Sequence, residues 1–177
     1  MRNIKLVIEY DGTNYHGWQI QPNVPTIQAE IESALKKITG RSEDETFRII
    51  GSGRTDTGVH ALGQTGNFLT ESKMTSTEFK KALNSVLPRD IVIVDSDEVD
   101  EDFNARFSAV SRTYKYVILN RPFPSAFHRN YAYFYPKELN LENLQACCNV
   151  LIGRQDFSSF QKSGSDRVNP ECTIYRA

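Results

Sequence analysis

The sequence predicts an α+β fold in which a ferredoxin-like antiparallel sheet, with its helices on one face, is followed by a second, incomplete α+β unit. Over about the first hundred residues, segments with strand-like and helix-like apolar spacing alternate as strand, helix, strand, strand, helix, strand. This is the element order of a ferredoxin-like unit. Further strand and helix patterns then begin, and the last of them, at Cys172, is cut short by the end of the chain.

The first half of this unit has clear boundaries. Apolar and polar residues alternate over residues 3–10, which predicts a strand with one buried face. Apolar residues at helical spacing then predict a helix. Thr26 precedes them as a suitable N-cap, and Gly40 follows them as a suitable helix end. Apolar residues at 47–50 predict the second strand, and residues 64–69 predict a third that pairs with it.

The second half of the unit is also marked by its end residues. Thr75 and Glu78 form a capping box ahead of an apolar helical pattern, and Pro88 stops that helix. Residues 91–94 form a short apolar run that predicts the fourth strand. Residues 95–102 hold six acidic side chains, and this segment is the expected boundary between the units.

The remaining residues predict a second sheet-and-helix unit. Residues 114–119 alternate with high β propensity, and residues 131–135 are a further candidate strand. A helix is expected between Asn140, its N-cap, and Gly153. We therefore expect two domains, an N-terminal one over residues 1–105 and a partial C-terminal one over residues 106–177.

Composition narrows the class of protein. No apolar run reaches the ~20 residues that span a bilayer, and the first residues do not open a signal peptide, so a cytoplasmic protein is expected. The three cysteines form no C-x-x-C pair and the three histidines lie far apart, so we expect no metal site. The net charge of −1 hides a local imbalance, because residues 106–129 carry five arginines and lysines and no acid. Such a stretch suits contacts with phosphates, and a solvated sheet edge is the ordinary alternative.

The segment most suggestive of chemistry is the glycine-rich stretch 51–61. It places Arg54 two residues from Asp56, and a nearby guanidinium favours an ionised carboxylate that can act as a nucleophile or acceptor. A solvated loop with an Asx-turn is the alternative. Residues 56–58 also match the Asp-Thr-Gly motif of aspartic proteases. The mechanism of those enzymes needs two carboxylates, whereas this sequence contains one such tripeptide. The phosphate-binding pattern G-x-x-x-x-G-K-[ST] is missing from the sequence.

Nine consecutive residues, Gly-Arg-Thr-Asp-Thr-Gly-Val-His-Ala at 53–61, resemble the signature of the tRNA pseudouridine synthase A family. Further segments resemble that family in the expected order along nearly the whole chain. They are residues 10–12, 17–19, 26–28, 83–84, 87–88, 90–91, 103–109, 112–116, 156–160 and 175–177.

This resemblance implies an enzyme that isomerises uridine to pseudouridine in the tRNA anticodon stem-loop, needs no cofactor and acts as a homodimer. It implies the pseudouridine synthase fold for the second unit. By the same resemblance Asp56 is the catalytic residue, Arg54 its neighbour at the substrate, and Tyr114 the aromatic placed against the target base. Family members continue beyond residue 177, so the resemblance also implies a truncated form whose activity and dimerisation are open.

Physical reasoning on the residues agrees with this expectation. A base inside a stem must leave its stack before its glycosidic bond is reached, and an aromatic ring such as Tyr114 stabilises it by about 1 to 3 kcal/mol. Arg106, Arg112 and Lys115 are the expected phosphate contacts. Core packing is the alternative for Tyr114, and a non-catalytic RNA-binding module on a ferredoxin-like or RRM-like sheet is the alternative function. An Asp-Thr-Gly protease is a distant third.

Overall fold

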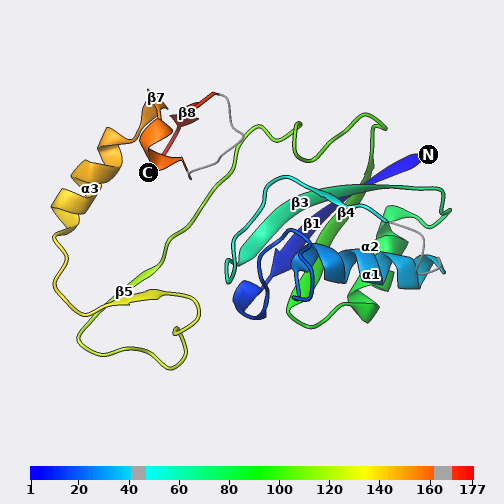
Figure 1. The fold of residues 1–177 in the computed structure, drawn as a ribbon, viewed down its shortest axis with the longest axis horizontal. Coiled ribbons are helices and arrows are strands. Elements are labelled where there is room, and N and C mark those ends of the chain that lie inside the picture. The colour runs from blue at the N-terminus through cyan, green and yellow to red at the C-terminus, as the bar shows by residue number, and fades with distance from the viewer. Residues whose placement is uncertain (41–46, 162–168) are drawn as a thin grey trace. The chain divides into compact units, whose positions relative to one another are not determined.

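The computed structural model describes residues 1–40, 47–161 and 169–177 (Figure 1). The chain divides into two compact units, Met1–Thr113 and Tyr114–Ala177. This division falls further along the chain than the one expected after Ala105. The acidic segment 95–102, expected as the boundary, instead belongs largely to the last strand of the first unit.

The first unit is a four-stranded antiparallel sheet with two helices on one face (Figure 1). Its strands have the order β2-β3-β1-β4, so β1 and β3 are central. The ferredoxin-like α+β class predicted from the sequence is confirmed. The elements are β1 (Arg2–Tyr10), η1 (Gly12–Asn14), α1 (Ile27–Thr39), β2 (Ile50–Gly51), β3 (Ala61–Thr70), α2 (Ser76–Val86) and β4 (Ile91–Val99).

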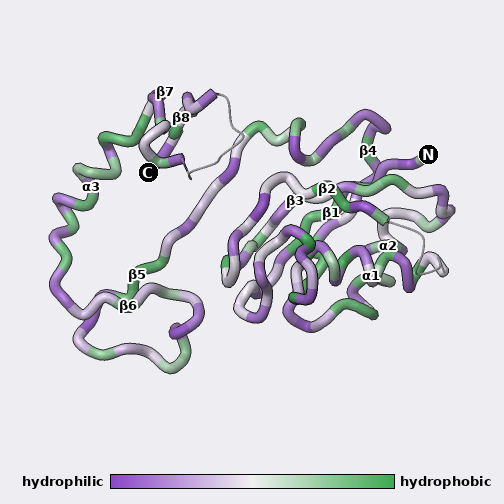
Figure 2. The backbone as a smooth tube through the Cα atoms, viewed as in Figure 1, coloured by the Kyte–Doolittle hydropathy of each residue, from purple (hydrophilic) through white to green (hydrophobic). Residues whose placement is uncertain are grey.

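The alternation along β1 decides which face of the sheet is buried. Ile4, Leu6 and Ile8 are fully buried against the helices, whereas Glu9 is exposed on the opposite face. Polar and apolar residues follow one another along the other elements of this unit as well (Figure 2). The hydrophobic core therefore lies between the sheet and the two helices, as the period of two in β1 and the helical spacing in α1 and α2 predict.

Both helices begin at the predicted caps. The Thr26 side chain accepts a hydrogen bond from the Ala29 N–H, and α1 ends at Gly40 in the left-handed conformation, with φ of 65°. At α2 the Thr75 and Glu78 side chains and backbones bond reciprocally, which is a complete capping box. These local signals fix the helix ends because they satisfy backbone groups that no other part of the helix can reach.

Three strands of this unit differ in length from their predictions. Strand β3 runs over Ala61–Thr70 rather than over residues 64–69. Strand β4 runs to Val99, because it pairs with β1 until Val99 lies opposite Asn3. Its acids face solvent and cost little there, since Lys5 pairs with Asp97 at 2.9 Å. Strand β2 is only two residues long, although Phe47, which precedes it, is buried in the core as an apolar strand residue would be.

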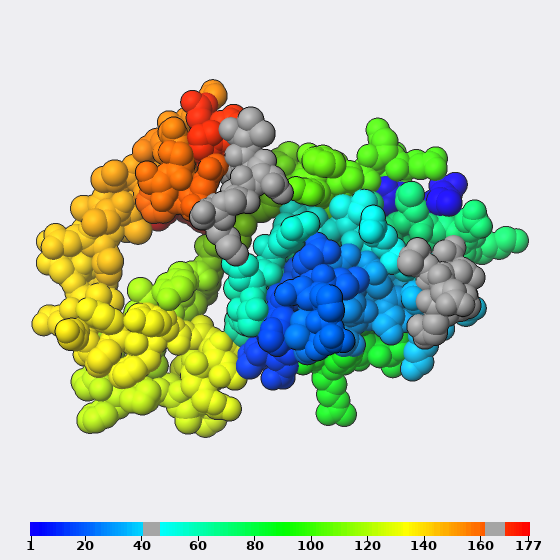
Figure 3. Space-filling view, in the orientation of Figure 1, coloured from blue at the N-terminus to red at the C-terminus, as the bar shows by residue number. Residues whose placement is uncertain are grey.

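The second unit contains six short elements. They are β5 (Ile118–Asn120), β6 (Tyr133–Tyr135), α3 (Leu141–Val150), β7 (Gly153–Asp156), η2 (Ser158–Phe160) and β8 (Glu171–Ile174). β5 pairs with β6 in parallel, and β7 pairs with β8 in antiparallel. Asn140 caps α3 as predicted. The elements of this unit, yellow to red in Figure 3, are spread out rather than closely packed on one another, and in the described part of the chain no residue of α3 is buried.

The strand predicted over residues 114–119 is wrong over its first four residues. The structure forms a strand only at Ile118–Asn120, and Tyr114 and Tyr116 precede it as exposed residues. A segment of high β propensity forms a strand only where a neighbouring strand supplies hydrogen bonds. Among the described residues β6 offers such partners over three residues alone.

Candidate active site

The loop that carries the predicted catalytic residue joins β2 to β3 and spans residues 52–60. Its entry is fixed by the sheet, because the Ser52 N–H donates to the Thr65 carbonyl at 2.8 Å. The Gln64 side chain reaches back from β3, and its Nε2 donates to the Gly53 carbonyl at 2.6 Å. These bonds hold the backbone that leads into the site.

The backbone on both sides of the predicted catalytic residue is bonded to the segment that follows β1. The Trp18 N–H donates to the Thr55 carbonyl at 3.0 Å, and the Gly58 N–H donates to the Tyr15 carbonyl at 3.2 Å. The hydroxyls of Tyr10 and Thr55 lie 2.8 Å apart in a further hydrogen bond. The loop is therefore braced from the end of β1 as well as from β3.

This bracing requires two glycines. Gly17 has φ of +85°, and a Cβ there would lie 2.3 Å from the Thr55 carbonyl oxygen. A Cβ at Gly12 would lie 2.1 Å from the Val59 carbonyl oxygen. Two backbone segments can approach this closely only where no side chain intervenes.

Trp18 supports the start of the loop from below. Its side chain is only 2% exposed, and its ring lies so close to Gly51 that a Cβ there would come within 2.6 Å of it. The ring centroids of Trp18 and Tyr10 are 6.3 Å apart. Trp18 therefore belongs to the core beneath the loop.

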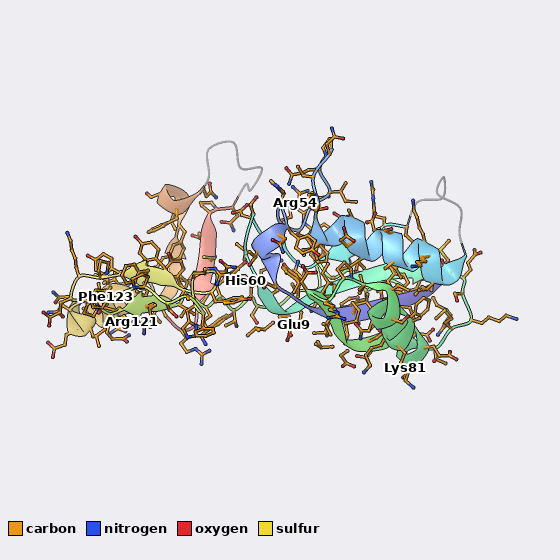
Figure 4. The ribbon with its side chains drawn as sticks, turned by 90° about the horizontal axis from the view of Figure 1, so that it is seen from below. Glu9, Arg54, His60, Lys81, Arg121 and Phe123 are labelled. Carbon is orange, nitrogen blue, oxygen red and sulfur yellow. The ribbon has the colours of Figure 1, made fainter. Side chains whose placement is uncertain are left out.

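Asp56 and Arg54 are both exposed on this braced backbone, and Arg54 is labelled in Figure 4. The Asp56 carbonyl accepts a hydrogen bond from the Val59 N–H at 3.2 Å, which closes a turn over residues 56–59. Within the described residues no ion pair joins Arg54 to Asp56, so the pairing expected from their spacing is not made. The arrangement presents a carboxylate to solvent from a fixed position, where it can act as a nucleophile, a base or a hydrogen-bond acceptor.

His60 fixes the other end of the loop. Its Nδ1 accepts a hydrogen bond from the Gly12 N–H at 3.1 Å and lies 3.0 Å from Asp11 Oδ1. Asp11 also accepts from the Thr13 N–H at 3.0 Å as the cap of η1. His60 thus joins the loop to the turn after β1.

The expected phosphate-binding residues have different surroundings. Arg112 lies beside the loop, with Nε donating to the Ser52 carbonyl at 3.1 Å and Nη2 bonding the same oxygen. The Arg106 guanidinium lies over the ring of Phe107, 5.7 Å from its centroid. Lys115 is exposed and belongs to the second unit.

Tyr114 is the first residue of the second unit and is 80% exposed. Core packing, the alternative considered for it, does not occur in the described part of the chain. The structure therefore carries Arg54 and Asp56 on one loop of the first unit and bonds Arg112 to the start of that loop, whereas Tyr114 and Lys115 belong to the second unit.

A polar network behind the loop was not predicted from the sequence. Gln19 Nε2 donates to Gln28 Oε1 at 2.8 Å, and Gln28 Nε2 donates to Glu32 Oε1 at 2.8 Å. The same Glu32 oxygen accepts from the Ile49 N–H at 3.0 Å. Burial raises the pKa of the Glu32 carboxyl above its ordinary value, and the two hydrogen bonds oppose that rise. A glutamate at helical spacing from a glutamine carries no local signal of such a role.

A second support was also missed. The buried Tyr15 hydroxyl donates to Asp90 Oδ1 at 2.7 Å, and the Asp90 carbonyl accepts from the Asp11 N–H at 2.9 Å. Burial and the Asp90 carboxylate raise the pKa of the Tyr15 hydroxyl. The turn before β4 thereby fixes the segment after β1, which in turn bonds to the Asp56 loop.

The described residues contain no group of three histidine, cysteine or acidic side chains placed to hold a metal ion. They also contain no helix long and apolar enough to cross a membrane.

Comparison with known proteins gives a consistent result. The family model described as tRNA pseudouridine synthase matches residues 6–108, which include the whole braced loop. A tRNA pseudouridine synthase A of Caldicellulosiruptor saccharolyticus is 58% identical over 94% of this chain and 66% of its own length. One from Caldicellulosiruptor bescii is 52% identical over 100% of this chain and 71% of its own length. One from Acetivibrio thermocellus is 51% identical over 98% of this chain and 70% of its own length. The chain thus spans about two thirds of the length of these curated relatives.

Proposed function

The chain belongs to the tRNA pseudouridine synthase A family, and on that premise we propose that it isomerises uridine to pseudouridine in the anticodon stem-loop of tRNA. The observation that carries the proposal is the loop 52–60. Its backbone is bonded to β3 and to the segment that follows β1, while Asp56 stays exposed. Positioned catalysis requires a reactive group whose backbone is held in place and whose side chain the substrate can reach.

The chemistry suits a single carboxylate. The reaction exchanges the N1–C1′ bond of uridine for a C5–C1′ bond, with a proton lost from C5 and one gained at N1. Atoms and electrons balance within the substrate, so neither a cofactor nor a metal is needed. Asp56 assists this exchange by attack on the sugar, attack on the ring or removal of a proton, three roles that one ionised carboxylate can fill.

The target base must be held outside its stack during this exchange. We propose that Arg54, exposed two residues before Asp56, contacts the extruded nucleotide. We propose that Tyr114 stacks on or beside the uracil, for which its 80% exposed ring is available. Stacking offsets the few kcal/mol that extrusion costs.

We propose that the tRNA backbone binds along residues 103–137, which contain no acid. Arg106, Arg112 and Lys115 are the expected phosphate contacts in this stretch. By family membership we further propose a homodimer in the full-length form and a cytoplasmic location, where tRNA is modified. Light scattering of the full-length protein tests the dimer.

The test is the change Asp56→Asn, which keeps the shape of the side chain and removes its charge. We expect this variant to bind tRNA about as tightly as the parent and to form no pseudouridine, because affinity comes from many phosphate contacts and Asp56 acts on one bond. Product is measured on a uridine-labelled tRNA transcript without metal or nucleotide.

The matched control is Glu9→Gln, which removes the charge of an exposed carboxylate on the opposite face of the sheet (Figure 4). It should retain the parent activity. Turnover by Asp56→Asn at the parent rate would overturn the assignment of Asp56. A parent that binds tRNA and forms no product would favour the non-catalytic RNA-binding module. The single Asp-Thr-Gly and the family membership leave no support for a protease.

A further inference from the structure

Arg112 is bonded to the loop that carries Asp56, although 60 residues separate it from Ser52 in the sequence. Two of its guanidinium nitrogens, Nε and Nη2, donate to the one Ser52 carbonyl oxygen. That carbonyl directly follows β2, whose pairing with β3 ends at Gly51. Arg112 therefore satisfies the first carbonyl after the end of the ladder.

The space for this contact is provided by Gly53. A Cβ at Gly53 would lie 3.2 Å from Arg112 Nε, so a side chain there would press on the guanidinium. The same short segment is fixed from its other side, because Ser52 donates to Thr65 and Gly53 accepts from Gln64. Arg112 is thus one of three groups that determine the path of the backbone as it enters the loop.

Arg54 and Arg106, the other two arginines proposed to contact the tRNA, have different surroundings. Arg54 is exposed, and Arg106 lies over the Phe107 ring. A guanidinium carries five N–H donors, and two of them bond to Ser52, so the remaining N–H groups on Nη1 and Nη2 are left for RNA binding.

We infer that Arg112 is a positioning residue for the isomerisation: its guanidinium holds the Ser52 carbonyl and so keeps the Asp56 loop in its reactive place. This inference rests on the proposed function. It goes beyond a phosphate contact, because it makes the rate of the chemical step, and not only tRNA affinity, depend on Arg112. A displacement of about 1 Å at a reacting group can lower a rate by as much as a hundredfold.

The experiment compares Arg112→Ala with Lys81→Ala in the full chain. Lys81 is an exposed residue of α2, well apart from Arg54 in Figure 4, so its removal changes the net charge equally and leaves the loop intact. The single-turnover rate at saturating enzyme reports the chemical step alone, and filter binding gives the Kd for tRNA. We expect Arg112→Ala to lower the single-turnover rate by about tenfold or more, and Lys81→Ala to leave it unchanged.

A second readout needs no substrate. Trp18 is the only tryptophan of the chain, lies under Gly51 and bonds to Thr55, so its fluorescence reports the loop. We expect acrylamide to quench Trp18 more strongly in Arg112→Ala than in the parent or in Lys81→Ala. Arg112→Lys, which keeps the charge but lacks the forked donors, should fall between parent and Arg112→Ala in both readouts. It serves as the test if Arg112→Ala does not fold.

The outcomes separate the two proposals. If Arg112→Ala raises Kd while its saturating rate and its Trp18 quenching equal those of the parent, Arg112 is a phosphate contact only and the inference is overturned. If the parent forms no pseudouridine, the proposed function fails, and the quenching experiment still decides whether Arg112 holds the loop.

Discussion

At the scale of single residues, two glycines set how closely the Asp56 loop approaches the segment after β1. Gly17 faces the Thr55 carbonyl and Gly12 faces the Val59 carbonyl, at distances that leave no room for a Cβ. Gly58 also has a positive φ, of +76°, but a Cβ there would meet nothing within 4 Å. Substitution of Gly58 therefore tests the energetic cost of the backbone conformation alone, whereas substitution of Gly17 adds the cost of a steric clash.

We expect Gly58→Ala to lower the free energy of unfolding by about 1–2 kcal/mol, the cost of a left-handed alanine. Gly17→Ala should cost a further ~1–3 kcal/mol, because it also forces the Thr55 carbonyl away. Urea denaturation of both variants measures the difference. Equal losses of stability would mean that the Gly17 and Thr55 backbones separate easily.

Tyr114 gives a second prediction at this scale, and it concerns activity. If the ring stacks on the uracil, Tyr114→Phe keeps most activity, and Tyr114→Ala loses about 1 to 3 kcal/mol of transition-state stabilisation. The measurement is kcat/KM on a tRNA transcript, with thermal melts to exclude unfolding. If Tyr114→Phe loses as much activity as Tyr114→Ala, the hydroxyl is the important group. If both variants keep the kcat/KM of the parent, Tyr114 does not stack on the uracil.

At the scale of elements, α1 does more than cover the sheet. Through Gln28 and Glu32 it bonds the side chain of Gln19, in the loop after β1, and the Ile49 N–H, just before β2. These two segments lead to Trp18 and to the Asp56 loop. The helix therefore fixes the spacing between the parts that brace the site, and it does so with a carboxylate whose pKa is raised by burial.

A raised pKa gives Glu32 a predictable effect on stability. The folded protein holds this proton at pH values above 4.5, where the unfolded chain releases it, so the contribution of Glu32 to stability falls as pH rises through that range. Glu32→Gln removes this titration. The difference in free energy of unfolding, variant minus parent, should therefore become more favourable to the variant as pH rises from 4 to 7.

Urea denaturation at several pH values tests this difference, and groups that both proteins share cancel from it. Ser33→Ala, at an exposed position next to Glu32 on α1, is the control and should show no pH-dependent difference. A variant-minus-parent difference that moves the other way with pH would contradict the raised pKa.

At the scale of the whole molecule, charge is separated along the chain. The acids of β4 are paired within the first unit, because Arg2 bonds Glu98 at 2.6 Å and Lys80 lies 3.8 Å from Asp95. These exposed pairs add little stability. They do leave the acid-free stretch 103–137 as the basic part of a chain whose net charge is −1.

We expect tRNA affinity to fall with salt despite that net charge, because local arginines and lysines release counterions and exposed acids more than about 10 Å away are screened at 0.1 M salt. Arg106→Ala and Lys115→Ala should each reduce the slope of log K against log salt by about 1. Arg112→Ala should reduce it less, since Ser52 occupies two of its nitrogens. Unchanged slopes for both Arg106→Ala and Lys115→Ala would locate the RNA surface elsewhere.

The sequence by itself determined the order of the elements in the first unit and pointed to the loop that we propose as the active site. The period of two in β1, the helical spacing of α1 and the capping box at Thr75 are local patterns, and the structure contains each of them. The nine residues at 53–61 were enough to suggest the family, which the comparisons confirm. Local patterns can be read because they depend on neighbours within a few residues.

Only the tertiary structure decided what braces that loop and where strands end. Arg112 on Ser52, Tyr10 on Thr55 and the close approach of Gly17 join residues that are 38 to 60 positions apart, and no local pattern encodes such a pair. One reason explains both why β4 is longer than predicted and why the strand predicted from residue 114 begins only at Ile118. A strand extends as far as a neighbouring strand offers hydrogen bonds, and that neighbour is chosen by the whole fold.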